Sequence, residues 1–182
     1  MSACLIRSAT TADAAAINSI LNPYIERSTA TFITKPSTIE QRLAWFAEHR
    51  DKHPIIVAVC DGVVVGYGAL STFRTRAAYA QTAEIAVYLR EDFHRRGIGR
   101  IIIGELQARA RLLGHHILVG VCCSESQASI GLLEACGFTR VGHLREVGRK
   151  FDRWLDIVIL EQVLAASMQS PENSRSAFPS SP

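Results

Sequence analysis

One continuous segment, residues 82–113, most constrains the fold of this 182-residue chain. Within residues 85–89, branched apolar side chains alternate with smaller or polar ones, and this period of two predicts a half-buried β-strand. A basic loop with two glycines follows at residues 94–99, and apolar side chains then recur at helical spacing over residues 98–113. The segment therefore predicts a strand, a loop and a helix in direct succession, with Gly114 as the C-terminal cap.

The loop at the start of this predicted helix is suited to bind an anion. The first N–H groups of a helix lack acceptors within the helix, and the helix dipole adds positive potential there. Gly97 and Gly99 would let a phosphate approach the backbone, while Arg95, Arg96 and Arg100 add positive charge. An ordinary solvated helix start with a basic face would contain the same residues, so the loop alone leaves both interpretations open.

The spacing of the loop excludes two common phosphate-binding motifs. A dinucleotide-binding fingerprint needs a third glycine three residues after Gly99, where this chain has Ile102. A Walker loop needs Gly-Lys-Ser/Thr, and this chain has Gly99-Arg100-Ile101. The remaining pattern resembles the Q/R-x-x-G-x-G pyrophosphate loop of the GNAT acetyltransferases, which hold acetyl-CoA. His94 occupies the position that is normally Gln or Arg in that loop.

Composition and charge exclude several other classes of protein. A formal net charge of +3 is too small to indicate a nucleic-acid partner. Apolar runs stay short of membrane-spanning length, and the N-terminal residues lack a signal-peptide pattern, so we expect a cytoplasmic protein without a membrane partner. The cysteines show no metal-ligand spacing, and we expect reduced, buried thiols and no bound metal. These cysteines are Cys4, Cys60, Cys122, Cys123 and Cys136.

Two further helices are predicted in the first 50 residues. Thr10 or Thr11 can cap a first helix, which Asn22-Pro23 should stop or kink. The segment 28–32 is polar and β-prone. Residues 37–40 form a capping box for a second helix. The side chains that this helix should direct inward are Ile39, Leu43 and Phe46.

Alternating and continuous apolar runs predict the strands, and Asp61-Gly62 predicts a tight hairpin turn. Helices and strands in this order predict an α/β fold with a mixed central sheet of about six to seven strands and helices on both faces. Residues 1–167 should form one domain, and the Ser- and Pro-rich residues 168–182 a disordered tail. The expected strands are 5–7, 55–60, 63–71, 85–89, 117–123, 139–147 and 155–164.

Beyond the loop, nearly the whole chain resembles the phosphinothricin and methionine sulfoximine N-acetyltransferases of the GNAT superfamily. The resemblance implies the GNAT fold, with splayed central strands that admit the pantetheine arm of acetyl-CoA, and it also implies a homodimer. The expected substrate is a small amino-acid-like amine. The shared stretches are 28–32, 40–46, 66–71, 73–79, 82–84, 87–89, 128–130, 137–138, 144–147 and 150–156.

Glu84 matches the family's proposed general base. An amine is mostly protonated at neutral pH, and a carboxylate can take the proton that must leave before the amine attacks a thioester. The alternative is a solvated glutamate at a strand end. Backbone N–H groups around residues 87–89 would polarise the thioester carbonyl. The residues expected to hold acetyl-CoA are Ile85, Ala86, Val87, Tyr88, Leu89, His94, Arg95, Arg96, Gly97, Ile98, Gly99, Arg100, Ser126 and Ser129.

Arg74 and Arg76 are candidates for binding the substrate's carboxylate or phosphinate, because a planar guanidinium can form two parallel hydrogen bonds to such groups. They could equally be solvated loop charges. Phe32, Tyr79 and Trp154 are candidates for pocket walls, although aromatic residues in plain core positions would look the same.

Two further positions depart from the family pattern. Ser126 stands where the family usually has Asn, a residue that contacts the cofactor arm. Leu133 stands where relatives carry His or Tyr as a candidate proton donor to the departing thiolate. Two other functions therefore stay open: acetylation of a protein N-terminus or lysine, and non-catalytic binding of acyl-CoA by a regulator. The carboxylate of Glu84 argues against the regulator.

Overall fold

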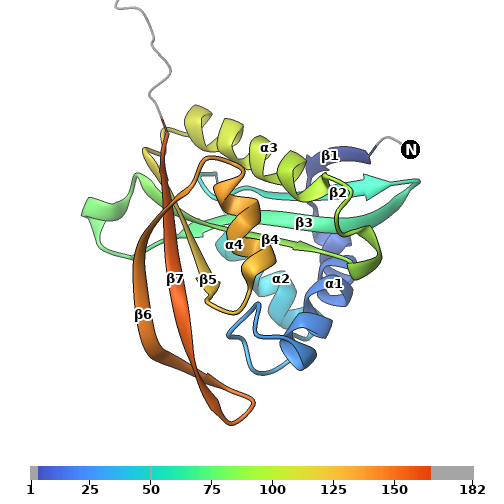
Figure 1. Ribbon diagram of the computed structural model, residues 1–182. Helices are drawn as coiled ribbons and strands as arrows, with labels where there is room; N and C mark the ends of the chain where they lie inside the picture. The colour runs from blue at the N-terminus through green and yellow to red at the C-terminus, as the bar shows by residue number, and fades with distance from the viewer. Residues whose placement is uncertain (1–3, 50, 165–182) are drawn as a thin grey trace, which may run out of the picture.

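A single seven-stranded sheet forms the centre of the molecule in the computed structural model, which describes residues 4–49 and 51–164. The strand order is β1-β2-β3-β4-β5-β7-β6, and every neighbouring pair is antiparallel except β4 and β5 (Figure 1). This mixed sheet confirms the predicted fold class. The strands are β1 (Cys4–Ser8), β2 (Ile55–Cys60), β3 (Val63–Thr72), β4 (Thr82–Leu89), β5 (Ile117–Cys123), β6 (Thr139–Lys150) and β7 (Arg153–Val163).

Helices cover both faces of the sheet, as predicted (Figure 1). On one face, α3 and α4 bury apolar side chains such as Ile102, Leu106 and Ile130. On the other face, α1 buries Ile17 and Ile25 against β2 and β3. The helices are α1 (Ala14–Arg27), α2 (Ile39–Glu48), α3 (Ile98–Leu112) and α4 (Gln127–Glu134).

The first helix does not stop at Asn22-Pro23, so that part of the prediction was wrong. Helix α1 continues through Pro23 to Arg27, because Ile25, beyond the proline, is buried in the core. A proline removes one donor from the helix, and core packing can offset that loss. Asn22 bonds outside the helix instead: its amide donates to Ser37 O at 3.3 Å, and its Oδ1 accepts from Ser37 N at 3.1 Å.

The second helix docks by a different side than predicted. Ile39 and Leu43 are about 40% exposed, whereas Arg42 is buried, with its Nε donating to Asn18 Oδ1 of α1 at 2.8 Å. The guanidinium also lies over the ring of Trp45 at 4.6 Å, so a charged side chain packs where two aliphatic ones were expected. Phe46 is half-buried against the same core.

Two local predictions need further correction. The capping box of α2 is formed by Thr38 and Gln41, one residue later than predicted: Thr38 N donates to Gln41 Oε1 at 3.0 Å and Gln41 N to Thr38 Oγ1 at 3.2 Å.

The segment 28–32 forms no strand. It instead contacts the turn between β6 and β7, where Lys150 Nζ donates to the carbonyl oxygens of Ser28 and Thr31, each at 2.7 Å.

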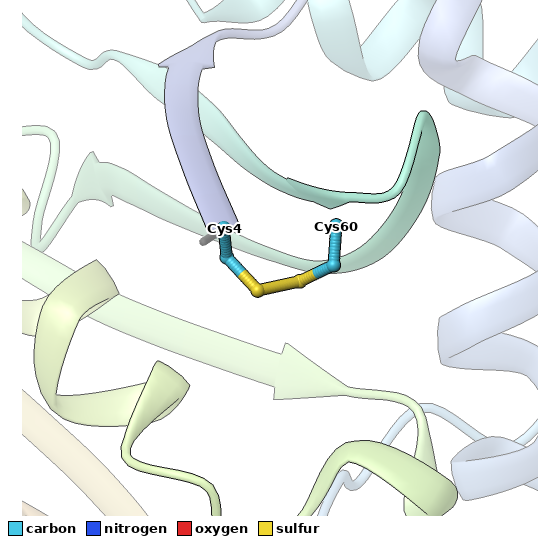
Figure 2. The surroundings of a disulfide bond; sticks show 2 residues. All are labelled: Cys4 and Cys60. Atoms are coloured by element: carbon cyan, nitrogen blue, oxygen red, sulfur yellow. A yellow bond between two sulfur atoms is a disulfide. The ribbon is translucent and has the colours of Figure 1, made fainter. Parts of the chain in front are cut away.

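The cysteine prediction was wrong for one pair, because Cys4 and Cys60 form a disulfide bond between β1 and β2 (Figure 2). The two residues are direct partners in the antiparallel register, with their Cα atoms 4.4 Å apart. That separation lies within the range that a disulfide can bridge. The register of two strands 56 residues apart is not readable from cysteine spacing. Cys122, Cys123 and Cys136 are free thiols, as predicted.

The central strands β4 and β5 separate along their length. In the described part of the sheet they are paired at Thr82–Ile117, Ala83–Leu118 and Glu84–Val119, and at no residue beyond. Strand β4 nevertheless stays paired with β3 as far as Leu89. One edge of β4 is therefore open over residues 85–89, which is the splay that the family resemblance implied.

The expected tail, residues 168–182, lies outside the residues that the structure describes. Within the described ranges, no helix is long and apolar enough to cross a membrane. The same ranges hold no group of three or more His, Cys, Asp or Glu side chains arranged to bind a metal ion.

Candidate active site

A cleft of about 870 Å³ opens where β4 and β5 diverge. Its walls are β4, the loop before α3, the first turns of α3, the end of β5 and the start of α4. Glu84 lines the cleft, as does every predicted cofactor-binding residue except Arg96. The fold thus brings together residues from position 84 to position 129 that the sequence analysis assigned to one ligand.

The loop before α3 turns through two left-handed residues, Arg95 (φ +58°) and Gly97 (φ +81°). Gly97 is the N-cap of α3, and its carbonyl accepts from Arg100 N at 3.1 Å, which begins the helical hydrogen bonding. Glycine adopts this conformation without the steric cost that a side chain brings. Gly99 is needed for a different reason, because a side chain at this position would overlap Leu132 of α4. The first-turn N–H groups of α3 thus lie at the lining of the cleft.

His94 joins the loop to α1 and to the end of β4. Its Nε2 lies 2.8 Å from the hydroxyl oxygen of Tyr24 and 3.3 Å from Leu89 O. The Tyr24 hydroxyl donates to Leu89 O at 2.5 Å. Burial, with a smaller contribution from Glu91, raises the pKa of Tyr24 to about 12, so the phenol remains a neutral donor. The departure of His94 from Gln or Arg thus has a structural role in fixing the loop.

Arg96 lies outside the lining of the cleft because its guanidinium stacks on Phe93, 4.6 Å from the ring centroid. Arg95 and Arg100 line the cleft, so two of the three predicted basic residues face the candidate ligand.

Glu84 is the last residue of β4 that pairs with β5, and it lies where the cleft begins. Burial raises the pKa of its carboxyl group above the ordinary value. Among residues 4–49 and 51–164, no hydrogen bond or ion pair is made by this carboxylate. A half-buried carboxylate without a polar partner binds a proton more readily than a solvated one.

The opposite wall combines polar and apolar side chains. Ser126 and Ser129 line this wall at the start of α4. The buried side chains of Leu133 and Cys122 line it as well. Burial raises the pKa of the Cys122 thiol to about 11. Leu133 has an apolar side chain and supplies no proton to the cleft. Two other cleft-lining groups carry a dissociable proton, the Cys122 thiol and the phenol of Tyr88, and burial also raises the pKa of Tyr88.

The predicted substrate-binding residues do not line this cleft. Arg74 stacks on Phe73 and Tyr79, at 5.3 and 5.9 Å from the ring centroids, in the loop between β3 and β4. Arg76 directly precedes a single 3₁₀ turn in the same loop and is exposed. This loop, light green in Figure 1, is well separated from the β6–β7 turn at the foot of the molecule.

The two remaining candidates, Phe32 and Trp154, lie near that turn. Phe32 packs so closely on Gly148 of β6 that a side chain at residue 148 would overlap its ring. Trp154 pairs with Arg149 across the hairpin and is 60% exposed. The five residues thus form two groups, and their roles stay predictions.

Several lining residues escaped the sequence analysis. Tyr24 belongs to α1, 70 residues before His94 of the loop that it contacts, and no local pattern links the two. Phe93 could have been noticed, because an aromatic residue beside a basic loop can hold one of its arginines. The other lining residues that the sequence analysis did not assign are Ala30, Glu91, Ile103, Val121, Cys122, Ala128, Leu132 and Leu133.

The central strands of the mixed sheet part over a cleft, and a glycine-containing loop precedes a helix at the edge of this cleft. These two features define a class of acyl-group transferases. Residues 6–159 match the family model described as acetyltransferase (GNAT) domain, and the chain belongs to this family. It is accordingly an N-acetyltransferase, the activity for which its relatives are named.

The relatives narrow this class further. The chain is 36% identical over 168 residues to an L-methionine sulfoximine/L-methionine sulfone acetyltransferase of Pseudomonas paraeruginosa, covering 91% of this chain and 98% of the relative. It is also 36% identical over 152 residues to a phosphinothricin N-acetyltransferase of Streptomyces viridochromogenes, covering 84% of this chain and 83% of the relative.

Solved structures are similar over the whole domain. A putative acetyltransferase from Salmonella typhimurium, solved with its cofactor acetyl-CoA, has a TM-score of 0.86 at 32% identity, covering 93% of this chain and 98% of that one. A ribosomal-protein-alanine N-acetyltransferase from Brucella melitensis has a TM-score of 0.85 at 35% identity, covering 88% of this chain and 99% of that one.

Proposed function

We propose that this enzyme transfers an acetyl group from acetyl-CoA to the amine of a small amino-acid-like acid of the methionine sulfoximine, methionine sulfone or phosphinothricin type. Glu84 is the general base. The observation that carries the proposal is the half-buried carboxylate of Glu84, which has no polar partner among the described residues and lies at the point where β4 and β5 part. The substrate class is supported by the names of relatives that share most of their length with this chain.

The described residues fit acetyl-CoA well. The N-terminus of α3 and the side chains of Arg95 and Arg100 would hold the pyrophosphate, since unpaired amides and guanidinium groups both favour anions. Ser126 and Ser129 would contact the cofactor arm. Over residues 85–89, backbone groups of β4 that point away from β3 have no strand to bind and can pair with the cofactor. In this proposal, N–H groups around residues 87–89 polarise the thioester carbonyl.

The chemistry assigned to Glu84 is removal of a proton from the incoming ammonium group. The neutral amine can then attack the thioester carbonyl directly: the C–N bond forms, the C–S bond breaks, and CoA leaves as a thiolate, which takes up the second proton that the nitrogen loses. The raised pKa of Glu84 suits this role because it makes the carboxylate a better proton acceptor than a solvated glutamate.

Arg74 and Arg76 remain our candidates for the acidic group of the substrate. The loop that carries them follows β3 directly after the residues paired with Glu84 and Ala83, so it begins beside the general base. Stacking on Phe73 and Tyr79 restrains Arg74, and a restrained guanidinium loses less entropy when it binds an anion.

A two-part experiment tests the proposed function. Consumption of acetyl-CoA is measured with methionine sulfoximine, methionine sulfone, phosphinothricin, free amino acids and N-terminal peptides. Glu84→Gln is then compared with the wild type on the best substrate, and turnover should fall by about 10²–10⁴ while the KM for acetyl-CoA barely changes. Glu105→Gln, which removes a carboxylate on α3 that pairs with Arg109 and does not line the cleft, is the control and should retain activity. Unaltered turnover in Glu84→Gln would refute the role of this residue as base.

Acetylation of a protein N-terminus is the second candidate function. It is favoured by the separation of the predicted substrate residues, which form two groups and do not line the cleft that holds Glu84. The peptides in the screen test this alternative directly.

We also infer from the family resemblance that the enzyme is a homodimer of the cytoplasm, where acetyl-CoA is available to it. The edge strand β6 supports dimerisation, because it exposes the apolar side chains of Val141, Leu144 and Val147. Light scattering of the full chain and fractionation of cells test the two inferences separately.

A further inference from the structure

Ser71 lies directly beside the proposed base. It is the register partner of Glu84 in the antiparallel pairing of β3 with β4, so both side chains project from the same face of the sheet. Directly opposed residues in such a pair have Cβ atoms about 4.5–5.5 Å apart. Tyr67 and Ala69 share this face with Ser71 and pack against α1, which places Ser71 on the face that α1 and α2 cover.

The hydroxyl of Ser71 is bound by a histidine from α2. His49, at the C-terminal end of the helix, has its Nε2 3.0 Å from Ser71 Oγ and its Nδ1 2.8 Å from Trp45 O. Its ring also packs on the indole of Trp45, with the ring centroids 4.2 Å apart. Two hydrogen bonds and one ring contact thus fix the orientation of this imidazole.

These contacts assign the hydrogen atoms. A carbonyl oxygen can only accept, so Nδ1 of His49 carries the hydrogen that is donated to Trp45 O. Burial lowers the pKa of His49 and outweighs the opposing effects of the Trp45 hydrogen bond and of Glu48, so the neutral ring is favoured. Nε2 is then an acceptor, and the Ser71 hydroxyl must donate to it. The lone pairs of Ser71 Oγ are left as acceptors on the face that it shares with Glu84.

We propose that Ser71, oriented by His49, is a second hydrogen-bond acceptor for the substrate's primary amine. This inference rests on the proposed function, because it takes Glu84 as the place where the amine is deprotonated. An ammonium group carries three N–H donors. Glu84 can take one proton, and an acceptor beside it can hold another N–H while the lone pair of nitrogen faces the thioester. In this arrangement Ser71 is the amine-binding residue and His49 is a positioning residue.

The first test separates amine binding from acetyl-CoA binding. With L-methionine sulfone as the acceptor, Ser71→Ala should raise the KM for the amine about 10- to 100-fold, the expected effect of losing a hydrogen bond to a charged group. The KM for acetyl-CoA should change by less than about twofold, since Ser71 does not line the cofactor cleft. Ser71→Thr keeps the hydroxyl and should restore most of the affinity. Thr72→Ala, on the opposite face of the same strand, is the matched control.

The second test addresses the positioning residue. His49→Phe keeps a ring against Trp45 and removes both nitrogen atoms, so the Ser71 hydroxyl is free to rotate. The KM for the amine should rise about 2- to 13-fold, because only a neutral hydrogen bond is lost. Long-range ¹H–¹⁵N spectra, with the His49 signal assigned by its absence from this variant, should show a neutral ring protonated at Nδ1.

The results that would overturn the role of Ser71 differ from those that would overturn the proposed function. An unchanged amine KM in Ser71→Ala, or equal increases in both KM values, would overturn the role of Ser71 even if Glu84→Gln still loses turnover. A His49 ring protonated at Nε2 would also overturn it. If the wild type acetylates no amine in the screen, the proposed function and this inference fall together.

Discussion

Glu84 is subject to two opposing requirements at the scale of a single residue. Burial makes its carboxylate more basic, which suits proton transfer, but a partly desolvated charge without a polar partner destabilises the folded protein. The folded pKa lies above the ordinary value of 4.5, so the native state binds more protons than the unfolded state between these two values. Protonation of Glu84 therefore stabilises the folded protein fully at pH values below 4.5, and this stabilisation is lost as the pH rises through the folded pKa.

Unfolding measurements at a series of pH values check the direction in which Glu84 changes the stability. Glu84→Gln cannot ionise, so it should unfold at a higher temperature than the wild type at pH 7. The difference should shrink as the pH falls toward 4, where the wild-type carboxyl is also neutral. Thermal unfolding from pH 4 to 8 measures both curves. A wild type that is more stable than the variant at pH 7 would mean that the folded protein stabilises the carboxylate.

At the scale of elements, the disulfide is the feature that most changes the expected stability. Cys4 and Cys60 join the edge strand β1 to β2 across 56 residues of chain. Closing a loop of this length restricts the unfolded state, and such a bond typically stabilises a protein by about 2–4 kcal/mol. The two cysteines do not line the cleft, so their bond should support the fold without contributing to ligand binding.

Reduction of this bond should lower the free energy of unfolding by about 2–4 kcal/mol while the KM for acetyl-CoA stays the same. Denaturant unfolding with and without a reductant measures the change, and Cys136→Ser serves as the control for a free thiol. Thiol titration of the denatured, unreduced protein should find three reactive groups among its five cysteines. A count of five would contradict the bond.

Elements governed by local patterns could be predicted from the sequence. The strand, glycine loop and helix of residues 82–113 were predicted in order, because alternation, loop chemistry and helical spacing are all properties of neighbouring residues. The Asp61-Gly62 hairpin was predicted for the same reason, and both residues have positive φ angles. The proposed cofactor part of the site is built almost wholly from such local segments, which is why all its predicted residues except Arg96 line one cleft.

Features that depend on packing between distant segments could not be predicted. The apolar spacing of α2 pointed to Ile39 and Leu43, but Asn18 of α1 offers a partner that buries Arg42 instead. The contact of His49 with Ser71 depends on where α2 docks against β3, and no sequence pattern contains that information. The amine-binding part of the site that we propose depends on such contacts.

At the scale of the whole molecule, the sheet consists of two groups of strands that meet at β4 and β5. Strands β1 to β4 form one group, and β5, β7 and β6 form the other. The described strands pair across the boundary at only three positions, while the cleft is lined by residues of both groups. A ligand in the cleft would therefore contact both groups and stabilise the folded state by mass action.

Coenzyme A should raise the unfolding temperature of the protein. At a concentration 100 times its Kd, the gain in free energy is about 2.7 kcal/mol. Arg100→Ala should raise the Kd about tenfold, because it removes a charged donor from the cleft. Arg96→Ala should leave the Kd unchanged, because the guanidinium of Arg96 stacks on Phe93 and does not line the cleft. Thermal shift titrations of the three proteins measure this. Equal losses of affinity for coenzyme A in the two variants would show that the loop acts only through its overall charge.

The division of the sheet also orders events during synthesis of the chain. Strands β1 to β4 and helix α3 end at residue 112, before any residue of β5, so the ribosome completes one wall of the cleft first. Because chains are made from the N-terminus and their early parts can begin to fold at once, this wall can assemble while the other is still being translated. The cleft then takes shape only with the last third of the chain, and a nascent enzyme gains its ligand site as one of the final steps of folding.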